Sequence, residues 1–118
     1  MTELSDSKSL VIYINSESIG SGDHELGKTL MGAYMDTLNQ SINEISHIIL
    51  INSGVKLACQ GSPVIEDLKA FSEVGAEILS CGTCLKSYGI LDELQTGVVS
   101  NMVDIVDTLK KASKVLNP

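Results

Sequence analysis

The sequence predicts an α/β protein whose five strands form one parallel sheet, with helices covering both of its faces. Two observations support this fold class. Short apolar runs alternate with helical patterns five times along the 118 residues, and no two runs are joined by a hairpin turn. Parallel neighbours need such crossovers, which are usually helices.

Each predicted strand is a short apolar run with β-branched residues, which is typical of a buried strand. The first run is LVIYIN at 10–15, and the second is HIILIN at 47–52. Three shorter runs follow at 76–80, 97–100 and 114–117. Together they account for the five strands.

The first helix is predicted to begin at His24 and to continue to about residue 40. Asp23 is placed to cap it, because an aspartate side chain can accept from the free N–H groups of a first turn. Its apolar face is defined by five side chains at helical spacing: Leu26, Leu30, Ala33, Tyr34 and Leu38.

The second long helix is predicted from its start and stop signals. Ser62 can cap it, with Pro63 at the first helical position, where the missing N–H costs nothing. Gly75 ends it. Its apolar face consists of Val64, Leu68 and Phe71.

Two further helices complete the pattern. A short helix is predicted over residues 83–88 and stops at Gly89. Asn101 caps a last helix over residues 102–111, whose closing lysines suit the negative end of a helix dipole.

Composition and charge restrict the classes of function. The formal net charge of −7 argues against a nucleic-acid binder, which needs clustered Lys and Arg. The longest apolar runs are about five residues, far short of the roughly 20 that span a membrane. The polar start, MTELSDSKS, carries no signal-peptide core. We therefore expect a cytoplasmic protein with three free thiols and no disulfide framework.

Small polar residues follow four of the predicted strands. Because the carboxyl ends of parallel strands share one edge, where α/β proteins bind ligands, we expect these residues to converge. Asn and Ser also cap helices and start turns, which is a purely structural explanation. The pairs are Asn15-Ser16, Asn52-Ser53, Ser80-Cys81 and Ser100-Asn101.

The motif CGTC places Cys81 and Cys84 where the third strand gives way to a helix. A thiol at such a position lies near free backbone N–H groups, which favour the reactive thiolate. The spacing also fits a thioredoxin-like dithiol that cycles through a disulfide. Thioredoxins, however, carry this motif after an early strand and need a proline opposite it. Here the motif follows the third strand, and the only prolines are Pro63 and Pro118. The structural alternative is that Cys81 and Cys84 are only two small buried thiols. For Cys59 we prefer this purely structural role.

Metal and dinucleotide sites fit the sequence poorly. A structural zinc site wants four ligands, and only Cys59 remains beside the CGTC pair. GSGDHELG departs from the dinucleotide fingerprint, and Asp23 and Glu25 would repel a pyrophosphate. We predict no metal and no cofactor. His24 either approaches the cysteine edge or lies exposed in a first turn, and His47 is expected to start the second strand.

Four blocks in order resemble the C-terminal domain of YedF-type proteins, in the DsrE/DsrF-like superfamily. They cover most of residues 10–116 and read IGSGDHELGKTLM, NSGVKLACQGSPVIEDL, GAEILSCGTCLKSYGI and GVVSNMVDIVDTL. The resemblance implies a flavodoxin-like three-layer sandwich and a DsrE-like domain over 10–118. Residues 1–9 then form a polar tail or linker.

The resemblance also implies a function. Sulfur-relay members carry a persulfide on a cysteine eight residues before a glycine, a spacing that Cys81 and Gly89 keep. The chain is thus expected to be a sulfurtransferase-like carrier of sulfur, or of selenium. Cys84 would discharge the persulfide or accept its sulfur, and the amides of Gly82, Thr83 and Cys84 would stabilise the anion. Asn15, Asn52 and Asn101 would shape the pocket.

The same resemblance implies partners. A homotrimer or hexamer is expected, which suits a chain with only 3% aromatic residues and an apolar surface. A TusA-like protein is a possible sulfur donor or acceptor. Two other functions stay open: an oligomeric module that binds a ligand or partner without catalysis, and a dithiol redox protein.

Overall fold

The computed structural model describes residues 8–118, which form one α/β sandwich around a five-stranded sheet. Every strand pair in it is parallel, and the strand order is β4-β3-β2-β1-β5. This confirms the predicted fold class. The strands are β1 (Leu10–Ile14), β2 (Ile45–Leu50), β3 (Glu77–Cys81), β4 (Val98–Ser100) and β5 (Lys114–Leu116).

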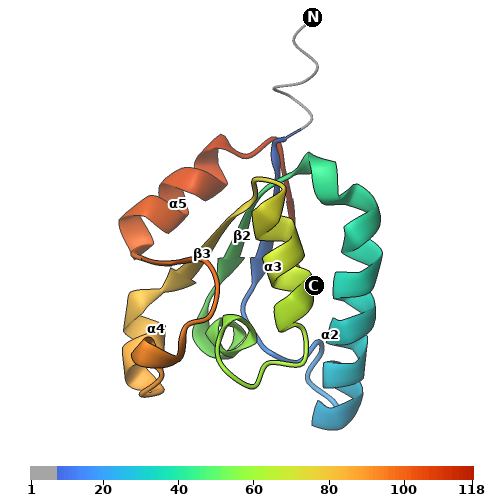
Figure 1. Ribbon diagram of the computed structural model, residues 1–118, viewed down its shortest axis with the longest axis vertical. Coiled ribbons are helices and arrows are strands. Elements are labelled where there is room, and N and C mark those ends of the chain that lie inside the picture. The colour runs from blue at the N-terminus through green and yellow to red at the C-terminus, as the bar shows by residue number, and fades with distance from the viewer. Residues whose placement is uncertain (1–7) are drawn as a thin grey trace, which may run out of the picture.

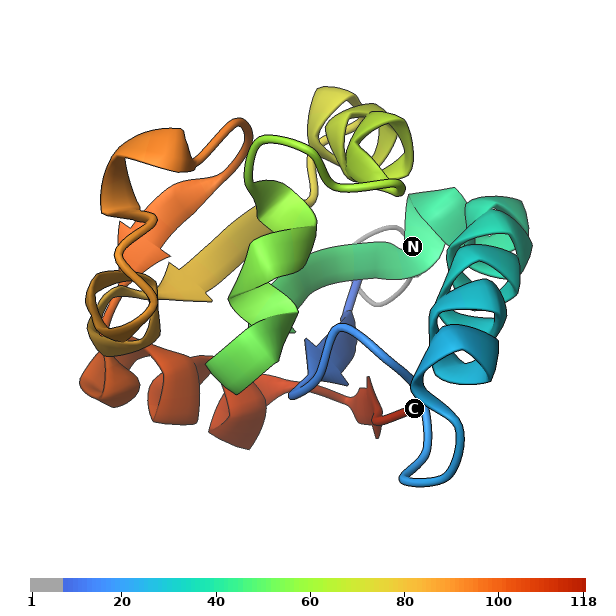
Figure 2. The same cartoon turned by 90° about the horizontal axis from the view of Figure 1, so that it is seen from below.

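Helices cover both faces of the sheet. The α-helices are α2 (His24–Leu38), α3 (Ile65–Glu73), α4 (Gly82–Ser87) and α5 (Met102–Lys111). Three 3-10 helices, which the sequence did not predict, join them: η1 (Asn39–Glu44), η2 (Asn52–Ala58) and η3 (Leu91–Glu93). In Figure 2, α3 lies on one face of the sheet and α5 lies on the opposite face.

The strand order follows from the direction of the crossovers. The chain winds from β1 through β2 and β3 to β4 in one direction, and α5 then carries it back to β5 beside β1. Right-handed crossovers in opposite directions place their helices on opposite faces. All strands point the same way, so α4 and η2 both lie at the carboxyl ends of the strands (Figure 1).

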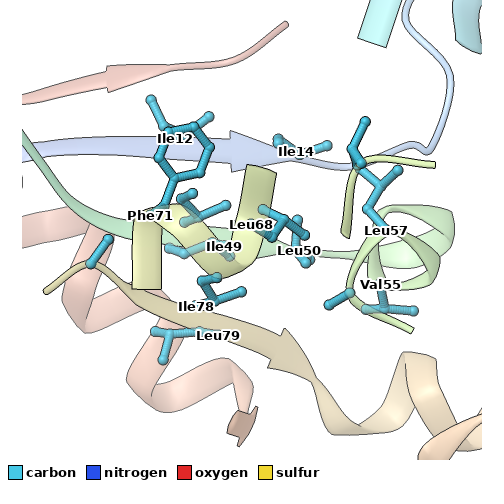
Figure 3. Close-up of a cluster of buried hydrophobic side chains, with 14 of the residues drawn as sticks. Ile12, Ile14, Ile49, Leu50, Val55, Leu57, Leu68, Phe71, Ile78 and Leu79 are labelled. Carbon is cyan, nitrogen blue, oxygen red and sulfur yellow. The ribbon is translucent and has the colours of Figure 1, made fainter. Parts of the chain in front are cut away.

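The core is aliphatic, as the scarcity of aromatic residues predicts. Isoleucines and leucines of β1, β2 and β3 pack against α3, where Leu68 and Phe71 are fully buried. Figure 3 shows this cluster, with Phe71 as its one aromatic ring. Burying one such side chain contributes roughly 1.5–3 kcal/mol, so the cluster fixes α3 and η2 on the sheet.

The predicted apolar face of α2 is wrong at most of its positions, although Leu38 is buried as predicted. Leu26 and Leu30 are 56% and 43% exposed, Ala33 is exposed and Tyr34 is half-buried. The buried stripe is instead Gly27, Met31, Met35 and Leu38. Both sets of α2 residues satisfy helical spacing, so the spacing alone does not identify the buried one. In the buried set, flexible methionine side chains fill the irregular space above the sheet. Gly27 decides between them, because a Cβ there would lie 1.9 Å from the Ser18 hydroxyl.

Most predicted helix ends are confirmed. Asp23 accepts a hydrogen bond from the N–H of Leu26, and Asn101 accepts one from Asp104. Gly75 and Gly89 have φ values of 108° and 71°, which suit glycine.

The start of α3 differs from the prediction. The helix begins at Ile65, two residues after Pro63, because Val64 is not helical at φ −114° and ψ 18°. The Ser62 hydroxyl still accepts a hydrogen bond, from the N–H of Val64, and so closes the turn before the helix. The predicted tail over 1–9 lies outside the described residues except for its last two, Lys8 and Ser9.

Candidate functional site

The candidate site lies at the carboxyl ends of β2 and β3. The last pair of the β2–β3 ladder is Leu50 with Ser80, and the last pair of the β3–β4 ladder is Cys81 with Ser100. The chain leaves β2 into η2 and leaves β3 into α4. These two short helices therefore meet at the edge where the sequence predicted a ligand site.

Cys81 is both the last residue of β3 and the N-cap of α4. Its side chain is only 4% exposed. Within the described chain its sulfur accepts no capping hydrogen bond from the first turn of α4. The stabilisation of a persulfide anion by the amides of Gly82, Thr83 and Cys84 stays a prediction.

Gly82 allows α4 to start close to β4. A Cβ at this position would lie 3.0 Å from Cγ1 of Val99 and 3.2 Å from the carbonyl oxygen of Ser100. Both distances are shorter than ordinary van der Waals contacts. The glycine therefore places the first turn of α4, and with it Cys84, against the end of the sheet.

Cys84 is half-buried and forms hydrogen bonds on two sides. Its sulfur accepts the backbone N–H of Asn52 at 3.1 Å, and its thiol contacts the side chain of Cys81. Burial raises the pKa of Cys84 above its ordinary value. The hydrogen bond and the charge of Cys81 raise that pKa further, while the N–H of Asn52 opposes them. Cys84 therefore holds its proton more firmly than a free cysteine does.

Asn52 has a backbone conformation that few residues adopt. It is the one residue other than glycine with positive φ among those described, at φ 54°. Asn tolerates this left-handed region better than most residues. The conformation lets the chain turn out of β2 and point its N–H at Cys84. The side chain is anchored too, because the Tyr88 hydroxyl donates to its Oδ1 at 2.7 Å.

A charged pair extends the cluster toward β1. The ammonium of Lys56 lies 4.4 Å from the centre of the Tyr88 ring and 3.6 Å from a carboxylate oxygen of Glu17. The N–H of Glu17 donates to the Ser53 hydroxyl at 3.1 Å, which ties the loop after β1 to η2. Segments following β1, β2 and β3 thus form one polar network.

Two cavities flank Tyr88. One, of about 340 Å³, is lined by Cys84 together with Asn52, Thr83, Ser87 and Tyr88. The other, of about 410 Å³, lies between η2, the loop after it and the segment around residues 88–93. Cys81 lines neither of them, whereas Cys84 lines the first cavity and contacts Cys81.

The structure brings some predicted site residues together and leaves others apart. Cys81, Gly82, Thr83, Cys84 and Asn52 share one site. Asn101 is exposed and bonds to Asp104 as a helix cap. Asn15 lines a separate cavity of about 320 Å³ beside Pro118.

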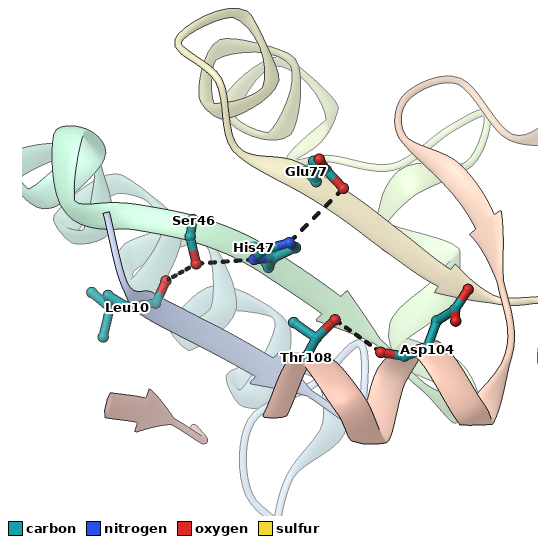
Figure 4. A network of polar contacts seen from close by, with 6 residues as sticks. All are labelled: Leu10, Ser46, His47, Glu77, Asp104 and Thr108. Carbon is teal, nitrogen blue, oxygen red and sulfur yellow. Dashed lines mark hydrogen bonds and ion pairs between the residues drawn. The ribbon is translucent and has the colours of Figure 1, made fainter. Parts of the chain in front are cut away.

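Neither histidine lies in the thiol cluster. His24 begins α2, where its carbonyl accepts from the Ser18 hydroxyl. His47 lies within β2 at the other end of the sheet, 3.8 Å from Glu77 and 2.9 Å from the Ser46 hydroxyl (Figure 4).

Sequence reasoning missed Tyr88, Lys56 and Glu17. A signal existed for Tyr88, because a residue four positions after Cys84 lies on the same side of a short helix. For Lys56 and Glu17 no local signal exists, since their contacts join segments far apart in the chain.

Among the described residues, no three His, Cys, Asp or Glu side chains gather as a possible metal-binding group. Within residues 8–118, none of the helices combines the length and apolar character that a membrane span requires.

Fold and site together define a class: α/β sandwich proteins with a cysteine at the carboxyl end of the third strand of a parallel sheet. The chain belongs to the DsrE/DsrF-like family, whose model matches residues 8–118. No curated protein matches the chain.

Solved structures share the fold. The YchN protein of E. coli is 21% identical with a TM-score of 0.66, over 94% of this chain and 99% of its own. MTH1491 of Methanobacterium thermoautotrophicum, a protein of unknown function, is 19% identical with a TM-score of 0.67 over the same shares. BT1422 of Bacteroides thetaiotaomicron, also of unknown function, is 18% identical with a TM-score of 0.64, over 93% and 95%. At these identities the likeness concerns the fold.

Proposed function

We propose that this protein is a sulfur carrier that holds a persulfide on Cys81. The observation that carries the proposal is the contact between Cys81, at the end of β3, and the half-buried Cys84 beside it. Two thiols that share a hydrogen bond beside a cavity suit the capture and release of sulfur. The resemblance to sulfur-relay members supports the same cysteine.

Loading needs a thiolate at Cys81. Because its pKa is raised, Cys84 keeps its proton and can donate its S–H to the sulfur of Cys81. A thiolate, the form that attacks sulfur, is the better acceptor of that bond. Attack on the outer sulfur of a donor R–S–SH then gives Cys81–S–SH and releases R–S⁻. One S–S bond forms and one breaks, so no reductant is consumed.

Burial suits a carrier. With Cys81 4% exposed, the terminal sulfur of a persulfide would be shielded from water-borne thiols. Access needs only a rotation of the Cys84 side chain about χ1, since cysteine has a single side-chain torsion to its sulfur. The site can thus open without moving the sheet.

Release can follow two routes through Cys84. Once Cys84 has lost its proton, its thiolate can attack the outer sulfur, which moves the sulfur to Cys84 and leaves Cys81 as a thiolate. Alternatively it attacks Sγ of Cys81, which forms a Cys81–Cys84 disulfide and releases HS⁻. The second route needs a dithiol reductant to restore the pair.

The test is intact-protein mass spectrometry after exposure to a sulfane donor. The wild type and the Cys84→Ser variant are expected to gain one sulfur, and Cys81→Ser is expected to gain none. Cys59→Ser is the matched control, because Cys59 is equally buried and its sulfur bonds to the carbonyl of Val55. A Cys81 that gains no sulfur and alkylates at an ordinary rate rejects the carrier and favours the ligand-binding module.

The same thiol contact favours dithiol–disulfide exchange as a second candidate. The Cys81–Cys84 reduction potential separates the two. A value between about −270 and −120 mV, the range of known dithiol catalysts, supports exchange. A pair that does not close to a disulfide at those potentials rejects exchange.

Identity and partners at a finer level stay predictions. We propose a YedF-type member on the CGTC motif, with selenium as an alternative cargo and a TusA-like protein as donor or acceptor. Self-association as a trimer or hexamer is supported by exposed apolar side chains on β4 and α5, namely Val98, Val99, Met102, Val103 and Val106. Light scattering tests this proposal, and a monomer in solution would refute it.

A further inference from the structure

The cavity of about 410 Å³ has the size of a small-molecule site, which typically spans about 300–1,000 Å³. Its wall includes both apolar and charged residues. Leu57, Pro63 and Ile90 give the apolar part. Charged groups enter from the loop after β1, from α2, from η2 and from the segment after α4, so four separate parts of the chain build it.

The charges of this cavity are balanced. Lys28 and Lys56 supply two ammonium groups, and Glu17 and Glu93 supply two carboxylates. Only Lys56 and Glu17 pair with each other among the described residues, and at 3.6 Å their contact is long and partly exposed. Lys28 and Glu93 form no ion pair within that part of the chain. Such a lining fits a zwitterion better than a simple anion.

Tyr88 connects this cavity to the thiols. Its side chain lines both this cavity and the one that holds Cys84. On one side its ring contacts the ammonium of Lys56, and on the other its hydroxyl bonds to Asn52, whose N–H reaches Cys84. A ligand held by the lysines would therefore have its remaining atoms directed past Tyr88 to the thiol pair.

We propose that this cavity binds the sulfur donor, a low-molecular-weight persulfide of an amino acid or short peptide. The inference rests on the proposed carrier function. The donor's carboxylates bind Lys28 and Lys56, and its ammonium binds Glu17 or Glu93. Its R–S–SH group reaches past Tyr88 into the cavity that Cys84 lines, where, once the Cys84 side chain has rotated away, the Cys81 thiolate takes the outer sulfur and R–S⁻ leaves.

Two donors test the site by loading rate. Glutathione persulfide carries the zwitterionic groups, whereas inorganic polysulfide does not. The double variant Lys28→Gln/Lys56→Gln is expected to load at least about tenfold more slowly from glutathione persulfide, the loss of roughly one charge-assisted contact. Its loading from polysulfide should stay within about twofold of wild type on the same scale. Lys86→Gln, on α4 and outside the cavity, is the matched control.

A binding measurement separates this inference from the carrier function. Reduced glutathione, the released thiol, is titrated into the Cys81→Ser variant and followed by NMR. Shifts at Tyr88 and Gln60 that the double lysine variant abolishes support the site, even if no persulfide ever forms. The site is overturned if the double variant loads sulfur from both donors as fast as the wild type does, or if the glutathione shifts map elsewhere. Neither outcome contradicts the loading of Cys81 itself.

Discussion

The backbone N–H of Asn52 donates a hydrogen bond to the sulfur of Cys84 at 3.1 Å. This contact joins the ends of two neighbouring strands, because Asn52 follows β2 and Cys84 lies in the helix that follows β3. Its geometry depends on the left-handed backbone of Asn52. The position of Cys84 is therefore set by a residue 32 positions away in the chain.

The conformation of Asn52 predicts an unusual order of substitutions. Asn52→Gly and Asn52→Ala both remove the bond to Tyr88, so their difference isolates the backbone. At φ 54° alanine is strained, and we expect Asn52→Ala to be less stable than Asn52→Gly by about 1 kcal/mol. Urea denaturation measures this. Asn39 has φ −58°, so there the order should reverse, with alanine above glycine. The same order at both positions would contradict the prediction.

The thiol pair predicts a pH effect on alkylation. Cys81 raises the pKa of Cys84 through a hydrogen bond and through its charge. The Cys81→Ala variant loses both contributions, so the pKa of Cys84 should fall and its alkylation should accelerate near neutral pH. The pH profile of iodoacetamide labelling, read by peptide mass spectrometry, gives the midpoint. Cys59→Ala should leave this midpoint in place, and a midpoint that rises in Cys81→Ala would refute the coupling.

Two glycines of α2 predict opposite effects of the same substitution. A Cβ at Gly27 would lie 1.9 Å from the Ser18 hydroxyl and 2.7 Å from the carbonyl of Ile19. Gly27→Ala must therefore push the loop after β1 away, at a cost of roughly 1–3 kcal/mol. A Cβ at Gly32 meets nothing within 4 Å, so Gly32→Ala should stabilise by up to about 1 kcal/mol. Thermal unfolding of the two variants tests the packing of α2, and equal effects would contradict it.

Ser80 predicts a stabilising change next to the site. Its hydroxyl is fully buried and has no hydrogen-bond partner among the described residues. Ser80→Ala removes an unsatisfied polar group and should raise the free energy of unfolding by about 1 kcal/mol.

Ser18 is the matched control for Ser80. It is 5% exposed, but its hydroxyl donates to the carbonyl of His24 at 3.0 Å. Ser18→Ala should therefore lower the free energy of unfolding by about the same 1 kcal/mol. Loss of stability in Ser80→Ala would show that its hydroxyl has a partner in solution.

Local signals carried most of the fold prediction. Short apolar runs identified all five strands, although β4 and β5 are mostly exposed, and side-chain caps such as Asp23 and Asn101 identified helix starts. The order of the strands in the sheet could not be predicted from these signals, because it depends on the direction in which each crossover runs. The face of α2 was also beyond them, since two stripes shared the helical period and only the contact of Gly27 with the preceding loop selects one.

Part of the candidate site could be predicted for a topological reason. Cys81 and Asn52 follow neighbouring strands, so parallel pairing alone brings them to one edge. The contacts that bring Tyr88, Lys56 and Glu17 to the site could not be predicted, because they depend on the turn at Asn52 and on the path of η2. Pairing alone would also place Asn15 and Asn101 at this site, because β1 pairs with β2 and β4 pairs with β3. Local structure separates them from it, since Asn101 caps α5 and Asn15 lines another cavity.

The common direction of the strands gives the molecule two chemically different ends. The His47–Glu77 contact lies where β2 and β3 begin, and both thiols lie where they finish. β1 begins at the former end, beside Lys8. A protein anchored to a bead, or joined to a larger assembly, through the segment before Leu10 would thus present its sulfur chemistry outward to approaching molecules.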